Sequence, residues 1–120
     1  MHPRIALLAT LALATGTAAA QGAPGVTKTE ITVGTIQDLS GPLAGYGKQI
    51  RLGMQQAVDE INEMGGVNGR KIKLLVEDSG YDPKRAVLAA QKLVTQNNGI
   101  FAMVGHLGTA QNMAAMPVQF

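Results

Sequence analysis

The residues best suited to chemistry lie in two glycine-containing segments, residues 38–47 (DLSGPLAGYG) and 105–109 (GHLGT). In the second segment, Gly108 and Thr109 come directly before a pattern typical of a helix start. Free backbone N–H groups, the positive end of a helix dipole and one hydroxyl would then converge on an anion, and a carboxylate fits that description. The alternative is that Thr109 only caps its own helix.

Other side chains of these segments could contact a ligand bound there. His106 could donate a hydrogen bond to it, although a single histidine in a turn also fits a structural role. Tyr46 could pack on the apolar part of a ligand, or simply against a neighbouring loop. The candidate substrate-binding residues are therefore Tyr46, His106, Leu107, Gly108 and Thr109.

Nucleotide-binding and catalytic motifs are absent. A phosphate-binding loop needs G-x-x-x-x-G-K followed by Ser or Thr, but Gly47-Lys48 is followed by glutamine, and the dinucleotide fingerprint G-x-G-x-x-G is missing after the first strand. No partners complete a catalytic triad. The acidic residues Glu77, Asp78 and Asp82 lack the spacing of an EF-hand calcium loop. We therefore expect no cofactor, no metal and no enzymatic activity.

The composition excludes several further classes of protein. The chain of 120 residues is 46% hydrophobic and 15% charged, which is enough apolar material for a packed core. A formal net charge of +2 provides no single-sign surface for nucleic acid. The absence of cysteine rules out a disulfide scaffold, a thiolate metal site and a lipid-modified bacterial amino terminus.

The first twenty residues have the pattern of a cleavable secretory signal peptide. Arg4 precedes an apolar run from Ile5 to Leu13, and small residues follow as far as Ala20. The apolar run is too short to cross a bilayer as a helix, so we expect an exported protein without a membrane anchor. The alternative is an ordinary buried helix at the amino terminus.

Strand and helix patterns alternate along the rest of the chain. Residues 21–29 contain glycine and proline and predict a flexible lead-in. Strands are predicted at 30–37, 71–77 and 100–104, and helices at 45–64, from Pro83 to the Asn97–Gly99 turn, and from 109 to about 116, where Pro117 breaks the last helix.

This order implies an α/β fold with a doubly wound parallel sheet and helices on both faces. In a sheet of strand order 2-1-3, the loops after the first and third strands flank the point where the winding reverses, and ligands bind in that crevice. We therefore expect the two glycine-containing segments to lie together there.

Three stretches resemble the exported substrate-binding proteins of branched-chain amino acid ABC transporters, the Leu/Ile/Val-binding type. They are ITVGTIQDLSGPLAGYG, AVDEINEMGGVNGRKIKLLVEDSGYDPKRAVLAAQKLV and VGHLGT. The resemblance implies a type I periplasmic binding protein (Venus-flytrap) fold, of which residues 30–120 would form an incomplete N-terminal lobe. It also implies that the Thr109 hydroxyl holds the ligand carboxylate, that Gly108 offers a backbone donor beside it, and that Tyr46 matches a tyrosine of the first loop.

By this resemblance, the expected function is capture of a small amino acid or a related carboxylate or amide in the periplasm, followed by delivery to the permease subunits of an ABC importer. The alternative is a ligand-sensing domain of the same fold that reports to a signalling partner. The acidic residue that meets the ligand ammonium in this family comes from later in the chain, and this sequence does not contain it.

Overall fold

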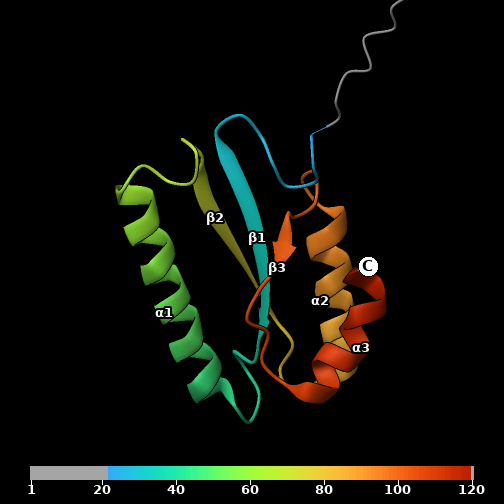
Figure 1. Cartoon of the computed structure of the whole chain (residues 1–120). Coiled ribbons are helices and arrows are strands. Elements are labelled where there is room, and N and C mark those ends of the chain that lie inside the picture. Colours follow the sequence, from blue (N-terminus) through green and yellow to red (C-terminus); the bar gives the residue numbers. More distant parts are fainter. Residues whose placement is uncertain (1–21, 120) are drawn as a thin grey trace, which may run out of the picture.

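The structure, a computed structural model, describes residues 22–119, and the predicted signal peptide lies outside these residues. The elements are β1 (Glu30–Gln37), α1 (Ala44–Glu63), β2 (Lys71–Asp78), α2 (Pro83–Thr95), β3 (Ala102–Met103) and α3 (Thr109–Gln119). The strands form one parallel sheet of order β2-β1-β3, with α1 on one face and α2 and α3 on the other (Figure 1). The predicted doubly wound α/β arrangement is confirmed. Within the described residues, no helix has both the length and the apolar character needed to cross a membrane.

The central strand β1 is paired very differently on its two sides. With β2 it pairs over its whole length, from Glu30 opposite Lys71 to Gln37 opposite Asp78. With β3 it pairs only through Val33 and Gly34. The strand predicted at 100–104 is therefore shorter than expected at both ends, and Gly105, with φ of +59°, bends the chain directly after Val104.

Helix α2 begins as its sequence predicts and forms one side of the core. The Asp82 carboxylate accepts a hydrogen bond from the Arg85 N–H at 2.9 Å, and Pro83 occupies the first helical turn. The apolar face of α2 then packs against the sheet and α3 through small side chains. The buried core consists of Ile36, Ala86, Ala89, Ala90, Leu93, Ile100 and Ala115.

Helix α3 continues through Pro117 as far as Gln119, the last residue that the structure describes, so the predicted break at this proline is wrong. Proline removes one helical hydrogen bond and crowds the preceding turn, which is why a break was expected. Beyond the proline, however, Val118 packs against the core and the Gln119 amide reaches the His106 ring. These contacts hold the last turn in helical form.

The predicted lead-in is hydrogen-bonded to the domain at Gly25. Its N–H donates to the Asn98 carbonyl at 3.0 Å, and its carbonyl accepts from the Thr32 N–H at 2.7 Å. Gly25 is buried, with φ of +69°, and a Cβ atom there would overlap the backbone of Ile100 and Phe101. Only glycine fits this close approach of two backbone segments.

Candidate functional site

The loops after β1 and β3 lie together at the carboxyl edge of the sheet, as the strand order predicts. The Leu107 N–H donates to the Ile36 carbonyl at 3.0 Å, and the Gln37 side-chain amide donates to the Gly105 carbonyl at 2.6 Å. These bonds fix the β3–α3 loop, residues 104–108, to the end of β1.

Gly108 and Thr109 form the amino terminus of α3. The Gly108 carbonyl accepts the Asn112 N–H at 3.0 Å, so Gly108 rather than Thr109 is the N-cap residue. The hydroxyl of Thr109, an exposed residue, makes no hydrogen bond within residues 22–119. The N–H groups of residues 108–111 likewise have no acceptor in that part of the chain. Four backbone donors and one hydroxyl thus stand at the positive end of a helix.

The His106 ring is half-buried and turned towards β1. Its Nδ1 atom accepts the Ile36 N–H at 3.0 Å, so the neutral ring carries its hydrogen on Nε2. The Gln119 side-chain amide lies 3.2 Å from Nε2, and it accepts this hydrogen when the amide oxygen faces the ring. Burial lowers the pKa of His106 below its usual value of 6.5. Because both ring nitrogens face protein groups, this geometry favours the structural alternative for His106.

Tyr46 lies in the first turn of α1, which follows the β1–α1 loop (residues 38–43). Its side chain is 69% exposed and lines a surface depression with Gly45 and Gln49. The ring is therefore accessible to a ligand, whereas Leu107 is half-buried and contributes its backbone to the attachment of the β3–α3 loop.

Sequence analysis missed the role of Asp38, which organises the β1–α1 loop. Asp38 is fully buried, and its carboxylate accepts hydrogen bonds from the backbone N–H groups of Ser40, Gly41 and Leu43 at 3.2, 2.5 and 2.7 Å. An aspartate followed within three residues by serine and glycine predicts a turn here, but the pattern does not reveal which N–H groups the carboxylate binds.

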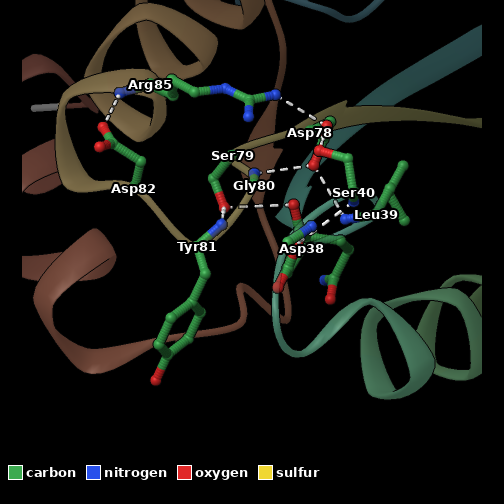
Figure 2. Close-up of polar contacts among 11 residues, drawn as sticks. Asp38, Leu39, Ser40, Asp78, Ser79, Gly80, Tyr81, Asp82 and Arg85 are labelled. Atoms are coloured by element: carbon green, nitrogen blue, oxygen red, sulfur yellow. Dashed lines mark hydrogen bonds and ion pairs between the residues drawn. The ribbon is translucent and has the colours of Figure 1, made fainter.

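A second carboxylate, Asp78, joins the β1–α1 loop to the β2–α2 loop (residues 79–82), as Figure 2 shows. Asp78 Oδ1 accepts the N–H groups of Leu39 and Gly80, both at 2.8 Å. Its Oδ2 accepts the Ser40 hydroxyl at 2.5 Å and the Arg85 guanidinium at 2.8 Å.

The ionisation of Asp78 follows from these contacts. Burial raises the pKa of Asp78, but the hydrogen bonds from Ser40, Leu39 and Gly80, together with the charge of Arg85, outweigh burial and lower this pKa to about 2. Across residues 22–119, no group of three or more His, Asp or Glu side chains is placed to hold a metal ion. Through its hydrogen bonds to Leu39, Ser40 and Gly80, ionised Asp78 ties the β1–α1 loop to the β2–α2 loop.

Tyr81 was also not selected from the sequence, yet it lies beside the amino terminus of α3. Its backbone carbonyl accepts the Gln111 side-chain amide at 2.6 Å, and its ring lies against Gly108. The β2–α2 loop thus joins the other two loops at the same edge of the sheet.

The parallel sheet and its helices form an α/β fragment of the type I periplasmic binding protein fold. The sequence pattern of the periplasmic binding protein family matches residues 30–119, and the chain belongs to this family. Two curated relatives are the Leu/Ile/Val-binding protein BraC3 of Rhizobium johnstonii, 47% identical over 76 residues, and the Leu/Ile/Val-binding protein of Escherichia coli K12, 39% identical over 89 residues. The matches cover 63% and 74% of this chain but 20% and 24% of the relatives, so the chain spans at most about a quarter of their length.

Solved structures agree with this assignment. A fatty acid ABC transporter substrate-binding protein from Thermomonospora curvata is 38% identical with a TM-score of 0.73, over 79% of this chain and 24% of that one. The branched-chain amino acid transporter substrate-binding protein LivJ of Streptococcus pneumoniae, in complex with isoleucine, is 34% identical with a TM-score of 0.70, over 75% and 26%.

Proposed function

We propose that this chain contributes the carboxylate-binding loops of a periplasmic, non-enzymatic solute-binding protein that delivers a small amino acid, or a related carboxylate or amide, to the permease subunits of an ABC importer. The observation that carries the proposal is the amino terminus of α3, where the N–H groups of residues 108–111 have no acceptor among residues 22–119. Such a terminus favours an anionic group.

The relatives support a carboxylate as that group. One solved relative is named for fatty acids and another is bound to isoleucine, and these two ligands share a carboxylate but little else. We therefore expect the residues that bind the shared carboxylate to lie on an element that the relatives have in common. In the proposed arrangement, the Thr109 hydroxyl and the Gly108 N–H bind the carboxylate, and Tyr46 contacts the apolar part of the ligand. His106 and Leu107 hold the turn against β1.

The test uses a chimera, because the chain covers only a quarter of its relatives. Residues 30–119 replace the matching segment of the Escherichia coli Leu/Ile/Val-binding protein, and calorimetry measures binding of leucine, isoleucine, valine and their amides. We expect the chimera to bind at least one of the amino acids. A folded chimera that binds none of the panel contradicts the proposal.

The role of Thr109 is tested in the same chimera. Thr109→Val removes the hydroxyl and keeps the branched shape, so it removes a charge-assisted hydrogen bond of roughly 1.5 to 3 kcal/mol, or about a 10- to 150-fold loss of affinity. Thr109→Ser keeps the hydroxyl and is the matched control. If Thr109→Val binds as tightly as the parent chimera, the hydroxyl does not contact the ligand.

A further inference from the structure

Tyr81 has a backbone conformation that its residue type disfavours. Its φ angle is +60°, in the left-handed region. Within residues 22–119 the other non-glycine residues with positive φ are asparagines, Asn68, Asn97 and Asn98, and asparagine is the type that best tolerates this region. Bulky residues persist there only where surrounding contacts hold them, and such positions concentrate at functional sites.

The contacts that hold Tyr81 lead to the amino terminus of α3. The Tyr81 N–H donates to the Ser79 hydroxyl at 3.3 Å, and its carbonyl accepts the Gln111 amide at 2.6 Å. A Cβ atom placed on Gly108 would lie 3.2 Å from a carbon of the Tyr81 ring. In Figure 2 the ring points away from the hydrogen bonds of Asp38 and Asp78.

Gln111 completes the contact from the side of α3. Its side chain is only 3% exposed, and its Oε1 atom is buried without a partner in the described part of the chain. The Gln111 amide cannot exchange the positions of its nitrogen and oxygen, because the Tyr81 carbonyl requires the NH2 group as a donor. In this orientation the amide also fills the space that a side chain at position 108 would need. Gly108, with φ of +108°, thus lies against both the Gln111 amide and the Tyr81 ring.

We infer that Tyr81 and Gln111 are positioning residues, which set the backbone of Gly108 and Thr109 and thereby couple the β2–α2 loop to the carboxylate-binding turn. The effect on ligand affinity rests on the proposed function, whereas the effect on the turn does not. The experiment therefore has one arm without ligand and one arm with it.

The first arm measures amide hydrogen exchange by NMR in the full chain. The reporters are the amides of Leu107 and Asn112, which are hydrogen-bonded to the carbonyls of Ile36 and Gly108 and flank the turn. Gln111→Met keeps the volume and removes the donor, and Tyr81→Asn suits the left-handed backbone but removes the ring. We expect about tenfold faster exchange of both reporters in each variant, with unchanged rates in β2. Tyr81→Phe keeps the ring and should match the parent.

The second arm measures binding of L-leucine to the chimera by calorimetry, together with its thermal midpoint. We expect Tyr81→Asn to weaken binding about tenfold at an unchanged midpoint, and Tyr81→Phe to restore parent affinity. A contact that only stabilises the fold would lower the midpoint and leave affinity unchanged.

Each result decides one statement. Unchanged exchange of Leu107 and Asn112 in Tyr81→Asn and Gln111→Met overturns the positioning role, as does faster exchange that extends equally into β2. Faster local exchange with unchanged leucine affinity overturns the coupling to the ligand. Faster local exchange in a chain whose parent chimera binds none of the amino acid panel leaves the positioning role standing and counts against the proposed function.

Discussion

Asp78 ties two loops together through one ionised carboxylate, and this sets how stability responds to acid. Its pKa falls from 3.8 to about 2 in the folded protein, so the folded state holds the ionised form more strongly than the unfolded chain does. The stabilisation, about 2 kcal/mol, is therefore present above about pH 4 and is lost as the pH falls towards 2. We expect Asp78→Asn to lower the free energy of unfolding by about this amount at pH 7.

Urea unfolding at pH 7 and at several values between about 4 and 2 measures this effect. The control is Glu63→Gln, which changes an exposed carboxylate of α1. Asp78→Asn should lose less stability on acidification than the parent, because it no longer has the Asp78 carboxylate to protonate. Equal free energies of unfolding for Asp78→Asn and the parent at pH 7 would contradict the role assigned to Asp78.

His106 should produce a second pH dependence, in a higher range. Burial lowers its pKa in the folded state, so the unfolded chain binds the proton more strongly and stability falls as the pH drops below about 6.5. Protonation of Nδ1 would also remove the acceptor that Ile36 uses. His106→Asn places an amide oxygen near the same position without a titratable group. We expect its free energy of unfolding to stay nearly constant where that of the parent declines.

The measurement is a series of urea unfolding curves between about pH 8 and 5, above the range in which Asp78 titrates. A parent curve as flat as that of His106→Asn would show that this ring does not control stability in the range.

At the scale of elements, Pro117 inside α3 lowers the stability of the helix, and a substitution can remove this effect. Pro117 is exposed, so its ring contributes little packing, yet it removes the N–H that would bond to the Met113 carbonyl. We expect Pro117→Ala to stabilise the protein by about 1 to 3 kcal/mol and to raise its helix content. Thermal unfolding followed by far-ultraviolet circular dichroism measures both. A lower thermal midpoint in Pro117→Ala would show that the proline ring holds the last turn in place.

The elements also show what the sequence could and could not predict. The strands β1 and β2 and the helices α1 and α2 were predicted to within about two residues, because their hydrophobic periodicity extends over many residues. The short strand β3 was overestimated, since an apolar run does not say how many of its residues pair with β1. The end of α3 was misplaced because the cost of Pro117 is local, whereas the packing of Val118 that offsets it is tertiary.

The candidate site likewise has features that the sequence predicts and features that it does not. The meeting of the two glycine-containing loops follows from strand order, which the sequence predicts. The hydrogen bonds of Asp38 and Asp78 do not follow, because a turn-forming aspartate does not reveal its partners. Tyr81 gave no signal, since nothing in a tyrosine indicates a left-handed backbone.

At the scale of the whole molecule, export should determine the amino terminus. The pattern of residues 1–20 predicts cleavage after Ala20, which leaves Gln21 as the first residue of the mature chain. Intact-mass spectrometry of protein from the periplasmic fraction measures this directly. A mass that retains the apolar run from Ile5 to Leu13 would exclude the predicted cleavage.

The hydrogen bond between Gly25 and Asn98 determines when the amino-terminal segment can join the domain during such an export. A chain that emerges from a membrane with its amino end first presents Gly25 early and Asn98 late, so the Gly25 N–H has no acceptor at Asn98 until most of the described chain is out. Joining residues so far apart in sequence is slower than forming a local helix. In an exported chain, the Gly25 segment therefore closes onto the domain only when the turn before β3 arrives.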